Sequence, residues 1–83
     1  MNKDLSDLIT LQINKELYSA YLYLAMASYF DATSLTGFAH WMKVQANEEF
    51  FHAMRFYNFM NDRGERVVLQ AIAQPDNDFE SVR

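Results

Sequence analysis

Cysteine is absent from the 83-residue sequence, which also contains only one proline and two glycines. The absence of cysteine excludes disulfide bonds, thiolate metal ligands and cysteine nucleophiles. Long apolar runs are missing too: the longest stretch without a formal charge, residues 17–30, has 14 residues and includes serine and tyrosine. Such a stretch is too short and too polar to cross a bilayer. The first ten residues lack the pattern of a secretory signal, so we expect a cytoplasmic protein with no membrane partner.

Basic residues are few, because 7 lysines and arginines face 11 aspartates and glutamates, for a net charge of -4. Nucleic-acid recognition needs a clustered basic surface, so we expect no nucleic-acid partner. Hydrophobic residues, by contrast, make up 51% of the sequence and aromatic residues 16%. A chain of this size cannot bury that much apolar surface alone. We therefore expect a partner chain, or further residues of the same chain, to cover part of it.

Two long helices are predicted, over residues of about 5–32 and 36–63, because helix-forming residues dominate both segments. Asn2 or Asp4 supplies a cap for the first helix. Gly64 suits the left-handed position that follows a helix. The short connection DATSLTG makes the two helices antiparallel neighbours. The predicted fold class is all-α, an antiparallel helical hairpin.

The sequence after Gly64 has no sustained helical periodicity, and we expect an extended crossing segment over residues 64–78. Asn77 and Glu80 have the spacing of a capping box, which predicts the start of a third helix. A helix that begins so near the last residue suggests part of a longer chain. We expect residues 1–83 to form one partial domain, half of a four-helix bundle completed by a second chain or by a C-terminal half.

Polar residues interrupt two otherwise apolar helical faces near their middle. Glu16 interrupts the first face, and Gln45, Glu49 and His52 interrupt the second. The two faces comprise positions 9, 13, 16, 20, 23, 27 and 30, and positions 38, 42, 45, 49, 52, 56 and 59. Helical rise places Glu16 and Glu49 at heights that agree within roughly one turn of an antiparallel hairpin. We therefore expect two carboxylates and one imidazole to converge inside the bundle.

Carboxylate and imidazole ligands together suit a divalent first-row metal such as iron, manganese or zinc. A glutamate on one helix and Glu-x-x-His on another is the known half-site pattern of di-iron carboxylate bundles. Alone, a Glu-x-x-His is more often a solvated pair and Tyr23 is more often a core residue, so the prediction depends on the joint placement. Glu48 lies off the predicted face and is a weak candidate for a second metal at its edge.

Three segments closely resemble the first half of bacterial and archaeal-type non-haem ferritins: INKELYSAYLYLAMASYFD, GFAHWMKVQANEEFFHAMRFYNFMNDRG and RVVLQAI. The resemblance covers the first two helices and the crossing segment, which is nearly the whole chain. It implies a four-helix-bundle subunit that assembles into a hollow cage of 24. It also implies a ferroxidase, in which Fe(II) is oxidised by O2 or peroxide to Fe(III) and stored as mineral, for iron storage and detoxification.

The resemblance also implies roles for individual residues at a di-iron centre. Glu16 and His52 correspond to ligands of the first iron, and Glu49 corresponds to the ligand that bridges two irons. Tyr23 corresponds to a nearby tyrosine of the catalytic centre. Glu48 corresponds to a glutamate that serves a third iron site in some prokaryotic members.

Two departures from the family pattern matter. Haem-binding members place a methionine directly after the bridging glutamate, and Phe50 stands there, so we expect no haem. The remaining ligands of the family come from the third and fourth helices, so this sequence supplies half of a di-iron centre. Alternative hypotheses are a non-catalytic, self-associating helical hairpin and a truncated fragment with no activity of its own. A DNA-protecting mini-ferritin is less favoured, since there is no basic tail and that group shares its ligands across a subunit interface.

Overall fold

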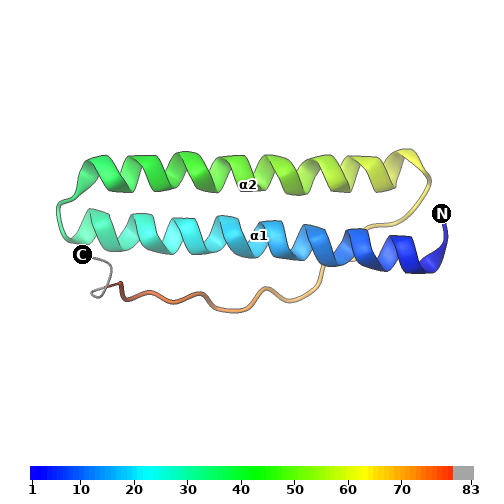
Figure 1. Ribbon diagram of the computed structural model, residues 1–83, viewed down its shortest axis with the longest axis horizontal. Coiled ribbons are helices and arrows are strands. Elements are labelled where there is room, and N and C mark those ends of the chain that lie inside the picture. Colours follow the sequence, from blue (N-terminus) through cyan, green and yellow to red (C-terminus); the bar gives the residue numbers. More distant parts are fainter. Residues whose placement is uncertain (80–83) are drawn as a thin grey trace.

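The computed structural model describes residues 1–79, and within them the chain is a helical hairpin without strands. Helix α1 spans Lys3–Ala32 and helix α2 spans Thr36–Asp62, and the two lie antiparallel and side by side (Figure 1). The prediction of an all-α antiparallel hairpin is therefore confirmed. Neither of these helices is long and apolar enough to cross a membrane.

The helix ends follow from local chemistry. The side-chain oxygen of Asn2 accepts a hydrogen bond of 2.8 Å from the Leu5 amide, so α1 begins two residues before the expected start. Ser34 has a φ of 64° in the tight turn between the helices. Helix α2 ends at Asp62, one residue before the expected end, and Gly64 takes a φ of 75° just beyond it. A left-handed backbone at that position is the conformation for which glycine is suited.

The buried residues of the two helices are mostly small, and they are Ile13, Ala25 and Ala27 of α1 and Ala39, Ala53 and Met60 of α2. Among them, Ile13, Ala53 and Met60 pack together as a narrow seam between the helices. Alanine side chains let two helices approach closely along their length. The two faces that we expected to form the core lie only partly in this seam, and Phe38 of the second face is 59% exposed. The physical reason is that two helices bury one line of contact, and a wider apolar face needs a second layer.

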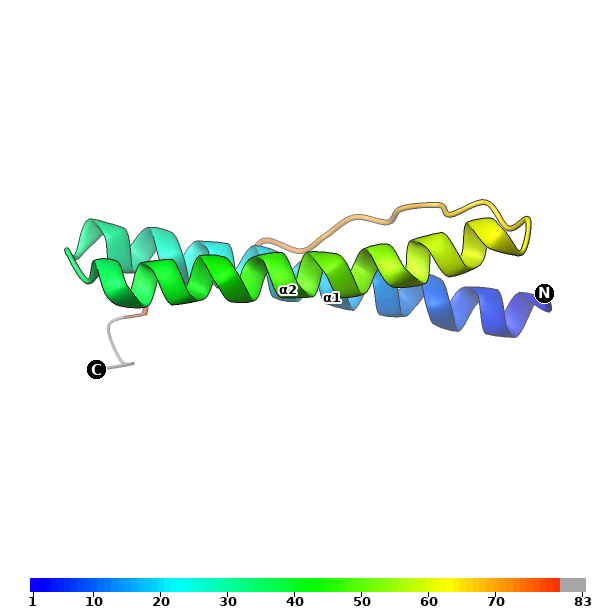
Figure 2. The same cartoon turned by 90° about the horizontal axis from the view of Figure 1, so that it is seen from above.

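The segment after Gly64 returns along α1 without helical structure, and its far end reaches the opposite side of the hairpin near the turn (Figures 1 and 2). The Asn14 side chain donates a hydrogen bond of 3.0 Å to the Ala71 carbonyl, which ties the segment to α1. Near the turn, the Phe79 ring packs edge-on against Tyr29 at 5.7 Å. The chain is not helical from Asn77 to Phe79, and Glu80, the other half of the expected capping box, lies outside the described residues.

Candidate metal centre

Glu16, Glu49 and His52 meet at mid-height on one face of the hairpin. Glu49 has thirteen residues of α2 on either side of it, and Glu16 has thirteen residues of α1 before it and sixteen after it. One possible ligand atom from each of the three residues lies within 4.8 Å of the others. Glu16 and Glu49 are close because they lie at the same height on two antiparallel helices. His52 joins them because it lies one helical turn after Glu49. We call these three residues the cluster.

The imidazole of His52 faces both carboxylates. Its Nδ1 atom lies 3.6 Å from Oε2 of Glu16 and 3.8 Å from Oε2 of Glu49. The side chains of Glu16 and Glu49 are only 16% and 21% exposed, whereas that of His52 is 43% exposed. The two helices therefore shield the carboxylates of the cluster from solvent, whereas the imidazole is more exposed. An ion can reach the cluster from this exposed side.

The two carboxyl groups compete for one proton. Hydrogen bonding to Glu16 is the main cause that raises the pKa of Glu49, with burial and the charge of Glu16 acting in the same direction. The same contact with Glu49 lowers the pKa of Glu16 against the opposing effect of burial. Such a pair prefers to share a proton, since two adjacent carboxylates repel when both are ionised. A divalent cation at this place would replace the proton and relieve the repulsion.

Gln12 is a member of the site that sequence reasoning missed. Its side-chain nitrogen donates a hydrogen bond of 2.9 Å to Oε1 of Glu16, and this bond helps to lower the pKa of Glu16. The bond holds one carboxylate oxygen in place while the other faces His52. The four-residue spacing of Gln12 and Glu16 is the signal that could have revealed it, because residues four apart are neighbours on a helix.

Other candidate residues lie outside the cluster. Tyr23 is partly buried on α1, seven residues after Glu16, and Glu48 is exposed to solvent on α2. The structure does not include either of them in the group that could hold a metal ion. Phe50 lies on another side of α2, where it lines a groove with Tyr21 and Leu24.

Two carboxylates and an imidazole form a donor set that suits iron, manganese or zinc. Di-metal carboxylate centres in helical bundles take such ligands from facing helices, usually from four of them. The described residues supply one glutamate from α1 and a Glu-x-x-His pair from α2. The fold and the cluster together define a helical hairpin that carries a candidate group of metal ligands.

The comparisons with known proteins assign the family. A model described as a ferritin-like domain matches residues 6–83. The bacterial non-heme ferritins of Staphylococcus saprophyticus and Staphylococcus aureus are 43% and 40% identical over 82 residues. The open pore ferritin of the archaeon Archaeoglobus fulgidus has a TM-score of 0.92 and 46% identity, over 96% of this chain. The chain belongs to the ferritin family, which confirms the predicted resemblance.

The chain spans about half the length of the relatives that it matches. It covers 49% of each of the two staphylococcal ferritins, although 99% of its own length is aligned. The match to the archaeal structure likewise covers 49% of that chain. The similarity therefore extends over both helices and the segment that follows them, and about half of each relative lies outside the matched region.

Proposed function

We propose that this chain binds Fe(II) at Glu16, Glu49 and His52 and takes part in its oxidation to Fe(III) for storage. The observation that carries the proposal is the convergence of two carboxylates and an imidazole within 4.8 Å on a hairpin of the ferritin family. The relatives are called ferritins and non-heme ferritins, which supports iron as the substrate. The name non-heme ferritin supports the expectation that no haem binds here, since Phe50 stands where a methionine ligand for haem would be.

Each residue has a proposed task. Glu16 and His52 bind one iron, and Glu49 bridges this iron and a second one. Anionic oxygen ligands favour Fe(III) over Fe(II), so carboxylate binding assists the loss of an electron. Two Fe(II) ions together give up two electrons, which reduce O2 to hydrogen peroxide, or peroxide to water, with uptake of two protons. Tyr23 is proposed as a nearby group that assists this electron transfer.

The complete activity is proposed for an assembly that supplies the other half of the centre. Three ligand side chains hold one ion well, whereas a di-iron centre needs about twice that number. Glu48, which is exposed beside the cluster, is proposed as a weaker ligand for an additional iron. Assembly into a ferritin cage and a cytoplasmic location are part of the same proposal.

An anaerobic Fe(II) titration followed by exposure to O2 tests this function. The experiment compares the unchanged chain with Glu49→Gln and with the matched control Glu48→Gln, which removes the same charge one residue away. We expect the unchanged chain to bind Fe(II) tightly and to form Fe(III), detected by its near-ultraviolet absorbance. The control should keep this tight binding and oxidation and lose only the additional, weakly bound iron. Glu49→Gln should lose tight binding while its helical circular dichroism is retained.

The opposite results separate the alternatives. If Glu49→Gln binds Fe(II) as tightly as the unchanged chain, the ligand assignment is wrong. If the unchanged chain binds no Fe(II), the alternatives of a non-catalytic hairpin or an inactive fragment are correct. Binding without oxidation would limit the function of this chain to holding iron.

A further inference from the structure

We propose that a second copy of this hairpin packs on the face that carries the cluster, so that each copy completes the metal centre of the other. This inference rests on the proposed function for the identity of the metal. The two copies would be related by a twofold axis that is perpendicular to the helices and passes between the two clusters. A pairing of this kind is isologous, since the same surface of each copy meets itself.

The position of the cluster along the hairpin favours this axis. Glu49 is the central residue of α2, and Glu16 lies within two residues of the centre of α1. A twofold axis through the cluster therefore lays the full length of one hairpin over the full length of the other. If the cluster lay near one end of the helices, a twofold axis through it would leave large parts of both hairpins uncovered.

The apolar residues at the two ends of this face are at matching heights. Phe38 and Trp41 come eleven and eight residues before Glu49, and Leu5 and Leu8 come eleven and eight residues before Glu16. Because the helices are antiparallel, the first pair lies about 16 and 12 Å from the cluster toward the turn, and the second pair lies equally far toward the open end. The twofold axis thus places Phe38 of one copy at the height of Leu5 of its partner.

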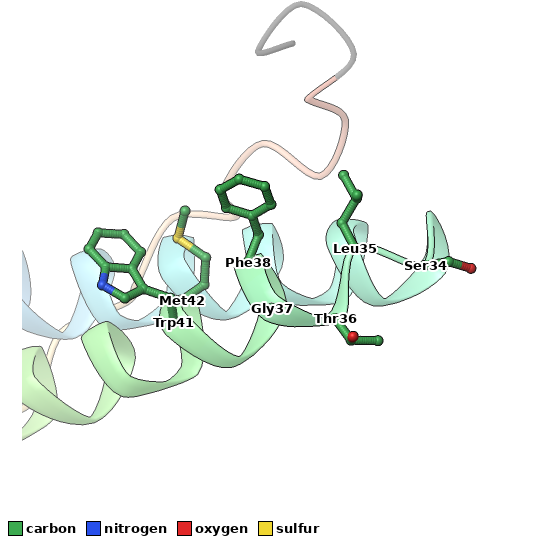
Figure 3. A pocket seen from close by; sticks show the side chains of 7 residues that line it. All are labelled: Ser34, Leu35, Thr36, Gly37, Phe38, Trp41 and Met42. Atoms are coloured by element: carbon green, nitrogen blue, oxygen red, sulfur yellow. The ribbon is translucent and has the colours of Figure 1, made fainter.

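These apolar residues are exposed to solvent in the single hairpin, where a partner chain could bury them. Phe38 and Trp41 are 59% and 53% exposed, and Leu5 and Leu8 are 45% and 64% exposed. Phe38 and Trp41 line an open apolar hollow at the turn, where Leu35, Phe38 and Met42 point to the same side (Figure 3). Phe79 and Tyr29 line a neighbouring hollow that shares Phe38 with the first one.

Charge and size agree with a second copy as the occupant. Two facing clusters bring four carboxylates and two imidazoles, and two divalent cations balance the four negative charges. Two helices of about 40 Å laid side by side offer on the order of 800 Å², which is about the area that each partner buries in a stable interface. The matched relatives are about twice as long as this chain, which covers 49% of them, so two copies together have about the length of one relative.

Single substitutions at the two ends of the face test the pairing in the presence of one equivalent of Zn(II), a cation that is not oxidised. We expect sedimentation velocity to show a dimer for the unchanged chain. Phe38→Glu and Leu5→Lys should each raise the dissociation constant by about tenfold or more, because each places two unpaired charges in the interface. Phe50→Glu is the matched control, since Phe50 is 50% exposed but lies in the groove with Tyr21 and Leu24.

Mixing Phe38→Glu with Leu5→Lys tests the register. In the mixed pair, the new glutamate meets the new lysine at one end and the unchanged Phe38 meets the unchanged Leu5 at the other. We expect native mass spectrometry to show the mixed pair in excess over both pure pairs, and circular dichroism to show folded helices in both variants. A mixture of Phe50→Glu with Leu5→Lys should show no such excess.

Three results would overturn the inference: a monomeric unchanged chain with Zn(II), dissociation by Phe50→Glu but not by Phe38→Glu, or no excess of the mixed pair. Failure of the proposed function is a separate result. A chain that pairs in this register but does not oxidise Fe(II) refutes the proposed function and supports the pairing. A monomeric chain that oxidises Fe(II) does the reverse.

Discussion

The substitution Glu49→Gln should make the metal-free hairpin more stable while it removes metal binding. The variant keeps the size of the side chain and removes one of two carboxylates whose oxygens lie within 4.8 Å of each other. Replacing a residue that stabilises the fold is expected to lower the free energy of unfolding. Replacing a residue that serves ligand binding can raise the free energy of unfolding, since functional sites hold groups that the folded state alone does not favour.

The distance between the two carboxylates gives the magnitude. The candidate ligand oxygens lie within 4.8 Å of each other, and two unit charges at that upper limit repel by about 1 kcal/mol at the permittivity of water and by about 3.5 kcal/mol at an effective value of about 20. Contact with His52 lowers the pKa of Glu49, but hydrogen bonding to Glu16, burial and the charge of Glu16 together outweigh it and raise the pKa. We expect a gain of about 1 kcal/mol, which corresponds to a rise in Tm of about 4–8 °C for a domain of this size.

The sign of the effect depends on pH. The pKa of Glu49 is raised in the folded state, so its protonated form is favoured there, and the unchanged chain loses this stabilisation as pH rises through the raised pKa. The gain from Glu49→Gln should therefore be full at pH values well above the raised pKa and vanish below the ordinary value of 4.5, where the group is protonated in both states.

Thermal unfolding followed by circular dichroism in excess chelator, at neutral and at acidic pH, measures this gain. Glu48→Gln is the control, since exposed Glu48 should change stability by less than about 0.5 kcal/mol. The electrostatic reasoning fails if Glu49→Gln lowers the Tm at neutral pH, or if its gain is the same at acidic pH.

Three further outcomes follow from the same geometry. Below the raised pKa of Glu49, the Zn(II) association constant should fall by about tenfold or more for each unit by which the pH is lowered, with protons released on binding, as calorimetry in buffers of different ionisation enthalpy would detect. Gln12→Leu removes the donor to Glu16 and should weaken Zn(II) binding by about 10–100-fold in a chelator competition, with unchanged helical content. Met60→Ala opens a cavity at a fully buried position and should cost about 2–5 kcal/mol in urea unfolding.

The convergence of the cluster could be predicted from the sequence because it depends only on regular geometry. Helical rise and a short turn fix the relative heights of Glu16 and Glu49, and helical periodicity fixes the side of α2 on which His52 lies. The hairpin itself follows from the two long helical segments and the connection between them.

The remaining features depend on contacts that periodicity does not specify. The bond from Gln12 to Glu16 requires particular side-chain rotamers, and the contact of Asn14 with Ala71 joins residues 57 positions apart. The expected core faces were also only partly right. The sequence pattern describes everything that a four-helix bundle would bury, whereas two helices bury only the seam around Ile13, Ala53 and Met60.

This seam explains how a hairpin holds two carboxylates that repel each other. Ile13 and Ala53 belong to one buried group, and each lies about one helical turn from a carboxylate of the cluster, Ile13 from Glu16 and Ala53 from Glu49. The small alanine allows the helices to approach closely at this height, so packing in the seam, rather than any attraction between the ligands, fixes the ligand separation. The favourable burial of the seam offsets the repulsion in the metal-free chain, and a divalent cation removes it. The preformed spacing means that binding energy is not spent on bringing the helices together.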